Sequence, residues 1–197
     1  MKELLQEMEA YAEDYHVPII KQEAAEILLR EAEGKRPIHI LEVGTAIGYS
    51  ALRMAAYLAE GGRITTIELS DERAELAQGY IARSPYQKQI KLLRGDAAEI
   101  LPTLDGEYDF VFIDAAKGQY ERYLDAIEER LTDGAIIAAD NVLFRGYVLG
   151  ENVEVPRRFR TITNRLRQFL SYLEASDHYS VTIYPEGDGI AICRYTK

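Results

Sequence analysis

Cysteine, long apolar runs and targeting segments are scarce or missing in this sequence. Cys193 is the only cysteine among 197 residues, which excludes an intramolecular disulfide and is typical of a reducing compartment. No apolar run approaches the roughly 20 residues that a membrane-spanning helix needs. The start, Met1-Lys2-Glu3-Leu4, lacks the basic and apolar regions of a signal peptide. We therefore expect a cytoplasmic protein with no membrane partner.

Basic residues are fewer than acidic residues. Lys and Arg number 23 against 33 Asp and Glu, which gives a formal net charge of −10 and excludes a surface that is basic all over. Hydrophobic content of 47% and charged content of 28% are ordinary for a soluble globular chain. At this length, a single α/β domain with a sizeable core is expected.

Apolar residues first follow a helical rhythm and then alternate between short runs and helices. Helical spacing over 3–15 and 21–33 predicts two N-terminal helices, the second ending near Gly34. From Ile38 onward, the pattern predicts strands at 38–43, 63–68, 90–94, 108–113 and 135–139, and helices near 48–60, 71–83, 96–102, 118–131 and 157–174. The stretches 179–184 and 189–195 indicate a closing hairpin.

This alternation of strands and helices predicts an α/β fold with right-handed crossovers. We expect a Rossmann-like, doubly wound, mostly parallel seven-stranded sheet with an antiparallel strand in the C-terminal hairpin, plus the N-terminal helices. The chain 1–197 is expected to form one domain, in which 1–34 is an N-terminal helical segment and 35–197 is the core. An irregular stretch with Gly146, Gly150 and Pro156 precedes the last long helix.

Two of the predicted strands end in carboxylates, and the second carboxylate is followed by an amide. Asp114 ends one strand, and Asp140-Asn141 ends the next. Neighbouring strands lie about 4.8 Å apart in a parallel sheet, and their carboxyl ends face one crevice. The three side chains could therefore form an all-oxygen ligand set, which suits Mg²⁺ or another hard divalent cation, with Lys117 at the rim. Each residue alone also fits an ordinary strand end or turn.

The first predicted strand runs into a glycine-rich turn at residues 44–48. Such a turn lets the backbone approach a ligand closely, although two glycines can also merely shape a strand–helix turn. Ala46 stands where a dinucleotide fingerprint has its middle glycine. Glu68, at the end of the second strand, suits two ribose hydroxyls, and Asp96 after the third suits an adenine edge. These features favour an adenosine-bearing ligand, NAD or S-adenosylmethionine, and Glu42 suits the partly cationic S-adenosylmethionine better.

Three motifs together resemble a known family. Residues 42–50, 112–120 and 140–146 are similar to the cation-dependent class I O-methyltransferases of the catechol and caffeoyl-CoA type. Within that family the likeness is greatest to bacterial tRNA 5-hydroxyuridine methyltransferases, which share a segment like residues 11–19 and an arginine-rich stretch after a proline, here 156–160. Relatives often carry a further helix before the segment that matches 11–19.

The resemblance implies specific roles for single residues. It implies a metal site at Asp114, Asp140 and Asn141, and catalytic roles for Asp114 and for Lys117, which would take the proton of the acceptor hydroxyl or stabilise the oxyanion. The N-terminal segment would cover S-adenosylmethionine as a lid, and a homodimer is expected. The expected cofactor contacts are Ile20, Glu42, Gly44, Thr45, Gly48, Ser50, Glu68, Asp96, Ala97 and Asp114.

An arginine cluster bears on the substrate. Residues 156–168 hold five arginines and no acid, which is typical of a phosphate-binding patch but also of an exposed helix face that pairs with nearby acids. Together with the resemblance, the cluster favours methylation of 5-hydroxyuridine at the tRNA wobble position to 5-methoxyuridine. A small catechol-like metabolite is the alternative substrate, and a non-catalytic nucleotide-binding or NAD-linked module is the third hypothesis. Tyr120, Phe144 and Tyr147 are candidates for stacking on a flipped-out base, although buried core roles compete, especially for Phe144. The residues expected at the RNA are Arg145, Arg157, Arg158 and Arg160.

Overall fold

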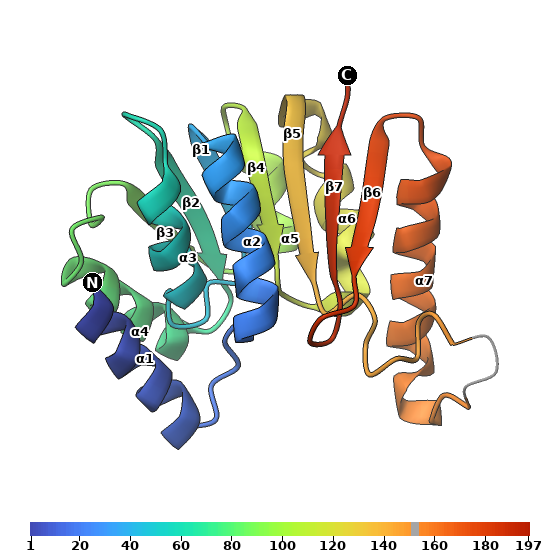
Figure 1. The fold of residues 1–197 in the computed structure, drawn as a ribbon, viewed down its shortest axis with the longest axis horizontal. Coiled ribbons are helices and arrows are strands. Elements are labelled where there is room, and N and C mark those ends of the chain that lie inside the picture. The colour runs from blue at the N-terminus through green and yellow to red at the C-terminus, as the bar shows by residue number, and fades with distance from the viewer. Residues whose placement is uncertain (151–153) are drawn as a thin grey trace.

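The computed structural model describes residues 1–150 and 154–197 and confirms the doubly wound α/β architecture (Figure 1). Its seven-stranded sheet has the order β3-β2-β1-β4-β5-β7-β6. The first five strands are parallel, and β7 runs antiparallel to both β5 and β6. The strands are β1 His39–Val43, β2 Arg63–Glu68, β3 Ile90–Arg94, β4 Tyr108–Ile113, β5 Leu131–Asp140, β6 Tyr179–Tyr184 and β7 Ile190–Tyr195.

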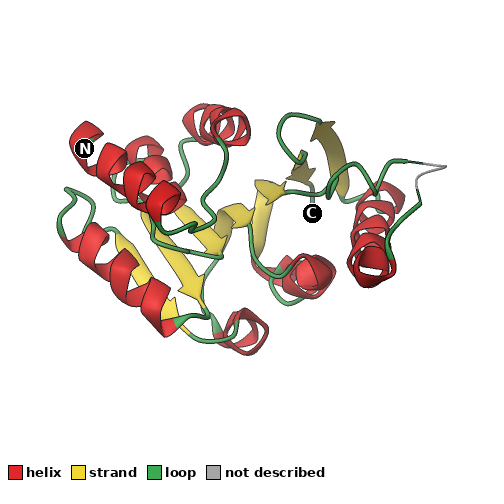
Figure 2. Cartoon of the chain, turned by 90° about the horizontal axis from the view of Figure 1, so that it is seen from below, coloured by secondary structure: helices red, strands yellow, loops and turns green. Residues whose placement is uncertain are grey.

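Helices cover both faces of the sheet (Figure 2). On one face, α1 Lys2–Asp14, α2 Gln22–Lys35, α3 Tyr49–Met54 and α4 Asp71–Ala82 pack on one apolar cluster. On the other face, α5 Ala97–Ile100, α6 Tyr120–Asp125 and α7 Arg160–Ala175 pack on a second cluster. The short 3-10 turns are η1 Ala55–Tyr57, η2 Leu101–Thr103, η3 Lys117–Gln119, η4 Glu128–Arg130 and η5 Arg157–Phe159. Over the described ranges, no helix has the length and apolar character needed to cross a membrane.

The two apolar clusters follow from the alternation of side chains along each strand. Ile40 of β1 belongs to the first cluster and Leu41 to the second, and Phe112 and Ile113 of β4 divide in the same way. Because helices cover both faces, the central strands are buried almost throughout and read as continuous apolar runs. This burial is why short apolar runs locate the central strands in the sequence.

The winding direction of the sheet changes between β1 and β4. The chain passes from β1 to β2 and β3 through helices on the first face, and from β3 to β4 through α5 on the second. Crossovers on opposite faces leave a crevice at the carboxyl ends of the two strands. The loops that follow β1 and β4 therefore meet, and the backbones of Gly44 and Asp114 lie in close contact there.

Several helices differ in extent from the sequence prediction. The helix expected at 48–60 ends at Met54 and continues only as η1. The helix expected at 96–102 has a single α-helical turn, because Pro102 falls in η2. Helix α2 passes Gly34 and ends after Lys35, where Arg36 takes the left-handed conformation with φ of 51°. Within the irregular stretch expected before the last helix, residues 151–153 lie outside the described residues.

The prediction of a helix at 118–131 is wrong over most of its length. Only Tyr120–Asp125 is α-helical there, and β5 begins at Leu131 rather than at 135. Leu131 is fully buried and pairs with Tyr108 of β4, a contact between segments distant in sequence. In the sequence, the pair Asp133-Gly134 is typical of a turn, but in the structure it lies within β5, where Gly134 adopts a φ of 70°.

Candidate active site

A hollow of about 640 Å³ opens at the carboxyl ends of the parallel strands. The loops after β1 to β5 line it, together with residues 18–21 of the N-terminal segment. Glu42 and Gly48 are not among the residues that line it. The expected site residues that do line it are Ile20, Gly44, Thr45, Ser50, Glu68, Asp96, Ala97, Asp114, Lys117, Asp140 and Asn141.

Gly44 brings the loop after β1 into contact with the loop after β4. A Cβ at residue 44 would lie 2.1 Å from the carbonyl oxygen of Asp114, so no side chain fits there. Gly44, Ala46 and Gly48 all have positive φ, of 103°, 47° and 88°. For Ala46 this conformation is strained, and strain of this kind is often found at functional sites. Gly48 itself packs against Ala77 of α4 instead of facing the hollow.

Glu68, at the end of β2, fixes the shape of this loop. The carboxylate is buried, with 6% exposure, and accepts hydrogen bonds from the backbone N–H of Ala46 at 2.8 Å and of Ser70 at 2.9 Å. Each carboxylate oxygen has a second lone pair. Glu68 can therefore accept two further hydrogen bonds from inside the hollow, as a ribose with two free hydroxyls would require.

Glu42 lies beneath the same loop and is fully buried. It accepts hydrogen bonds from the hydroxyls of Ser50 and Thr66, and Thr66 in turn hydrogen-bonds to Thr45. Burial raises the pKa of Glu42 to about 7, against the opposing effect of the two hydroxyls. Ser50 and Thr45 line the hollow and Glu42 does not. Glu42 therefore helps to position these two side chains, Ser50 directly and Thr45 through Thr66.

Asp114, Asp140 and Asn141 converge at the ends of β4 and β5. Asp140 is 2% exposed, and its pKa is raised to about 7 by burial and by the negative charge of Asp114. Burial also raises the pKa of Asp114, and the charge of Lys117 acts in the opposite direction. The two carboxylates repel each other, and together with the amide oxygen of Asn141 they fit a hard divalent cation. In the described part of the chain, no cluster of three His, Cys, Asp or Glu side chains offers a competing metal site.

The backbone holds the second carboxylate and the amide in a fixed arrangement. Asn141 has φ of 55°, and its N–H donates to Asp140 Oδ1 at 2.7 Å. The hydroxyl of Tyr120 donates to the carbonyl oxygen of Asp140 at 3.0 Å. Asn is one of the few residues that adopt this left-handed conformation at little cost. The Asp-Asn pair at this position is therefore suited to the turn as well as to the ligand set.

Lys117 begins the turn η3 beside the two carboxylates. Its charge acts to lower the pKa of both Asp114 and Asp140. The next residue, Gly118, accepts a hydrogen bond of 2.9 Å from Arg165 of α7. The position of Lys117 thus depends on α7, a contact that sequence reasoning missed because the two segments are distant in the chain.

The N-terminal segment covers one side of the hollow. Ile20 lines it and is 6% exposed. Helix α1 is anchored to the neighbouring helices by Glu9, which accepts a hydrogen bond from the Tyr49 hydroxyl, and by Glu7, which pairs with Arg83 just after α4. Tyr49 lines the hollow and so connects the position of α1 to its wall. Sequence reasoning assigned Tyr49 no role, although it directly follows Gly48 in the glycine-rich motif.

The arginines around Pro156 divide into two groups. Arg165 and Arg167 donate to backbone carbonyl oxygens and serve the fold. The other arginines of this stretch do not line the hollow. However, η5 and the start of α7 lie at the end of the sheet where the parallel strands terminate (Figure 1). Arg145, Arg157, Arg158 and Arg160 are exposed and form no ion pair with any described residue, although Arg160 also donates a hydrogen bond of 3.2 Å to the backbone carbonyl oxygen of Val155.

Two of the three aromatic residues expected to stack on a base are buried. Tyr120 is 1% exposed and Phe144 8%, so the stacking hypothesis is wrong for both. Tyr147 is half-buried, and its ring centroid lies 6.0 Å from that of Phe159. Phe159, which sequence reasoning missed, lies beneath the guanidinium groups of Arg145 and Arg158, at 5.1 Å and 4.6 Å. These cation–π contacts keep two exposed arginines close together.

Comparison with known proteins finds a matching family. A family model described as O-methyltransferase matches residues 1–196. The chain is 30% identical over 184 residues to a caffeoyl-CoA O-methyltransferase from Populus kitakamiensis, covering 90% of this chain and 77% of that protein. It is 36% identical over 163 residues to a catechol O-methyltransferase from Niastella koreensis, covering 78% and 72%. The structure of the O-methyltransferase TomG from Streptomyces achromogenes, in complex with S-adenosylmethionine, matches with a TM-score of 0.87 at 26% identity, covering 99% of this chain and 90% of that chain.

Proposed function

We propose that this chain, which belongs to the S-adenosylmethionine-dependent class I O-methyltransferases of the caffeoyl-CoA and catechol type, methylates 5-hydroxyuridine at the wobble position of tRNA. The product would be 5-methoxyuridine. Membership of a methyltransferase family leaves no support for the NAD-linked or non-catalytic hypothesis.

The exposed arginines are the observation that favours tRNA as the acceptor. Arg157, Arg158 and Arg160 have no acidic partner among the described residues, although the chain has a net charge of −10. An acidic protein that leaves a local group of guanidinium groups unneutralised is suited to a polyanion at that place. The three arginines lie in η5 and at the start of α7, at the end of the sheet where the parallel strands terminate (Figure 1). The proposed metal ligands follow β4 and β5 at that same end, so a bound RNA can reach both.

The catalytic arrangement follows from the residues around the hollow. We place Mg²⁺, or another divalent cation, at Asp114, Asp140 and Asn141, where it would lower the pKa of the acceptor hydroxyl and align it through the neighbouring oxygen. In 5-hydroxyuridine these two oxygens are the 5-hydroxyl and the 4-carbonyl. Lys117 takes the hydroxyl proton or stabilises the developing oxyanion. Ile20 covers the hollow and limits the access of water.

The cofactor would lie along the loops after the first three strands. Glu68 accepts the ribose hydroxyls, and Asp96 and Ala97 meet the adenine. Ser50 and Thr45, both held in the hydrogen-bonded group around Glu42, contact the methionine part. Residues of the glycine-rich loop and of the carboxylate group would then hold the cofactor and the acceptor on opposite sides of the hollow, and S-adenosylmethionine would supply the methyl group.

A small catechol-like metabolite is the second candidate acceptor. The relative from Niastella koreensis, 36% identical, is a catechol O-methyltransferase. A catechol offers two oxygens on adjacent ring carbons, as 5-hydroxyuridine does, so the same ligand set would serve either substrate. The exposed arginines would have no role with a small neutral catechol, and this makes tRNA the better fit.

Mass spectrometry of tRNA nucleosides tests the proposal. Hydroxyuridine-containing tRNA is incubated with the protein, S-adenosylmethionine and Mg²⁺, and 5-methoxyuridine is expected. A parallel reaction with Asp140→Ala protein controls for contaminating enzymes. Methylation of a catechol without conversion of tRNA would replace the first candidate by the second.

A cytoplasmic homodimer, the assembly implied by the family resemblance, is part of the same proposal. Light scattering coupled to gel filtration gives the mass of the particle directly. The mass of one chain, 22.3 kDa, would overturn the dimer and leave the assigned activity untouched.

A further inference from the structure

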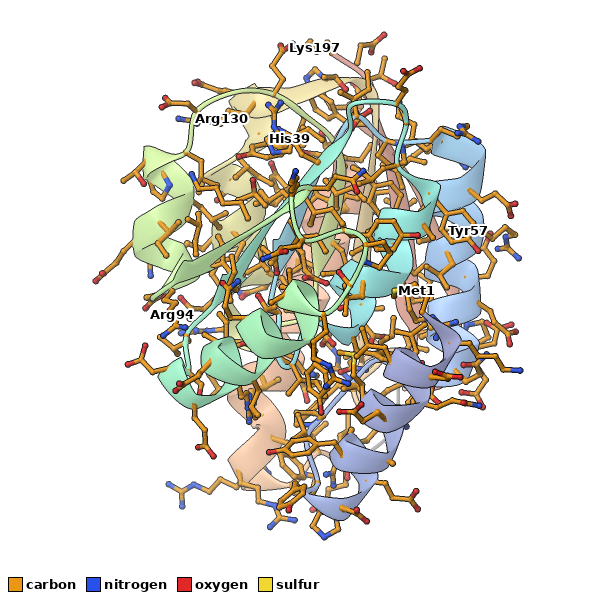
Figure 3. The ribbon with its side chains drawn as sticks, turned by 90° about the vertical axis from the view of Figure 1, so that its left-hand side faces the viewer. Met1, His39, Tyr57, Arg94, Arg130 and Lys197 are labelled. Carbon is orange, nitrogen blue, oxygen red and sulfur yellow. The ribbon has the colours of Figure 1, made fainter. Side chains whose placement is uncertain are left out.

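A second hollow, of about 600 Å³, lies over the edge strand β3 and the neighbouring strands β2 and β1, on the face of the sheet that carries α5. It shares no lining residue with the candidate active site. Figure 3 views the molecule from the β3 edge of the sheet and labels His39 and Arg94, both of which line the hollow. The connection from β3 to β4 contains only the single turn α5 and η2. So short a connection covers only part of the sheet face.

The sheet face changes from apolar to polar along its strands. Leu41 and Ile67, toward the carboxyl ends, belong to the apolar cluster under α5. Two residues earlier on the same strands, His39 and Thr65 form the floor of the hollow, with His39 Nε2 at 3.0 Å from Thr65 Oγ1. Lys91 of β3 pairs with Thr65 and continues the polar row. This part of the face is therefore suited to water or a polar ligand rather than to a helix.

The hollow concentrates positive charge on an acidic protein. Its lining holds four exposed cations against one carboxylate, Asp105, while the whole chain has a net charge of −10. Within the described residues, none of the four forms an ion pair. Like charges held together without partners repel one another, and a bound anion would relieve this repulsion. The four cations are Arg63, Lys88, Lys91 and Arg94.

Protection of the sheet edge does not account for this arrangement. Lysines on an edge strand discourage pairing with other chains, and Lys91 on β3 can serve that purpose. Arg63, however, lies on the inner strand β2. Its Nη2 lies 3.2 Å from His39 Nδ1, which is also 3.0 Å from the carbonyl oxygen of Glu107. When Nδ1 carries the proton and donates it to Glu107, that guanidinium nitrogen has no acceptor there.

We propose that this second hollow is a binding site for a phosphate-bearing anion. Two guanidinium groups can each donate two parallel hydrogen bonds to phosphate oxygens, two ammonium groups add point charges, and the volume admits a diphosphate. The phosphate comes either from a free diphosphate compound or from the backbone of a bound RNA. The first source is independent of the proposed tRNA activity, and the second rests on it.

Titration with inorganic pyrophosphate tests the site itself. In chelator-containing buffer, calorimetry should detect binding, and amide resonances of Thr65 and Lys91 should shift. Lys88→Gln/Lys91→Gln should weaken binding by at least about tenfold, since each substitution removes a charge-assisted interaction. The matched control Lys2→Gln/Arg30→Gln removes two exposed charges outside the hollow and should bind as wild type does. Absence of pyrophosphate binding to the wild-type protein, together with unchanged tRNA binding by the Lys88/Lys91 variant, would overturn the proposal.

Measurement of tRNA affinity against salt identifies the source of the phosphate. If the tRNA backbone occupies the hollow, Lys88→Gln/Lys91→Gln should reduce the slope of log K against log salt by about 0.7–0.9 for each lysine–phosphate interaction that the variant cannot form. Pyrophosphate binding with an unchanged tRNA slope would assign the hollow to a free diphosphate compound. Neither outcome depends on whether methyl transfer to tRNA is observed.

Discussion

The guanidinium group of Arg165 donates a hydrogen bond of 2.9 Å to the carbonyl oxygen of Gly118. A Cβ at residue 118 would lie 3.2 Å from Cδ and Nη1 of the arginine, so the two segments are in close contact. Gly118 directly follows Lys117, and Arg165 belongs to the helix that begins beside the exposed arginines. One hydrogen bond therefore joins the residue after the proposed proton acceptor to the helix that begins beside the proposed RNA contacts.

Removal of this interaction should slow methyl transfer without weakening cofactor binding. Arg165→Ala frees the η3 turn, and the loss of one hydrogen bond, about 0.5–1.5 kcal/mol, should lower kcat by about 2- to 10-fold. Single-turnover kinetics and calorimetry with S-adenosylhomocysteine separate the two effects. Arg165→Lys should recover part of the rate, and Gln168→Ala, an exposed position on the same helix, should have no effect. Equal losses in kcat and in cofactor affinity would argue for a general structural role.

The proposed metal ligands should be essential for turnover but not for cofactor binding. Asp140→Ala removes one of two carboxylates from the ligand set. Changes to groups that merely support metal ligands already cost about 10- to 100-fold, so kcat should fall by at least about 100-fold. Calorimetry should show that S-adenosylhomocysteine still binds. Asp133→Ala, an exposed aspartate in the same strand, is the matched control. Full activity of Asp140→Ala in chelator-treated buffer would refute the metal assignment.

Glu68 should contribute strongly to cofactor affinity. Its carboxylate already holds two backbone amides of the pocket loops, and it is placed to accept two ribose hydroxyls. Loss of charge-assisted hydrogen bonds costs about 1.5–3 kcal/mol, so Glu68→Ala should weaken S-adenosylhomocysteine binding by at least about tenfold. Exposed Glu72 offers a control substitution two residues into α4. An unchanged dissociation constant would remove Glu68 from the ribose site.

The sequence was sufficient to predict the central strands because they are buried on both faces. Each central strand is a short apolar run flanked by turn residues, and such runs locate β1 to β4 to within one residue. The failure at 118–131 has a different origin. The start of β5 is fixed by pairing with Tyr108 and by burial of Leu131, and neither contact leaves a local pattern in the sequence.

Strand ends were also sufficient to locate the candidate site, because topology brings the carboxyl ends of parallel strands together. Long-range contacts were beyond sequence reasoning. Arg165 looked like one more basic residue of a cluster, and only the structure shows its hydrogen bond to the carbonyl oxygen of Gly118. Phe144 was a candidate for stacking on a base, with a core role as the competing interpretation, and the structure shows that it is buried in the core. Glu42 looked like a direct cofactor contact and instead lies behind Ser50.

Glu42 should make the free energy of unfolding depend on pH. The folded-state pKa of about 7 lies above the usual 4.5, so the folded chain binds the proton more tightly than the unfolded chain. The free energy of unfolding should therefore fall as pH rises from about 4.5 to about 7, by up to about 3 kcal/mol. Asp140, whose pKa is also raised to about 7, adds to the slope. Urea denaturation of Glu42→Gln at pH 5 and pH 7.5 should show a smaller difference than wild type, and an equal difference would contradict the assignment.

The exposed arginines should contribute to the affinity for tRNA but not to cofactor binding or to methylation of the free nucleoside. Arg157→Ala/Arg158→Ala/Arg160→Ala removes three charges that have no acidic partner among the described residues. If they contact phosphates, tRNA binding should weaken, and the slope of log K against log salt should flatten by about 0.7–0.9 per phosphate. S-adenosylhomocysteine affinity and methylation of the free nucleoside should be unchanged, because none of the three lines the candidate active site. A control with Lys2, Arg30 and Lys197 replaced by Ala removes the same charge elsewhere. A cluster variant that binds and methylates tRNA as wild type does at physiological salt would favour the small catechol-like acceptor.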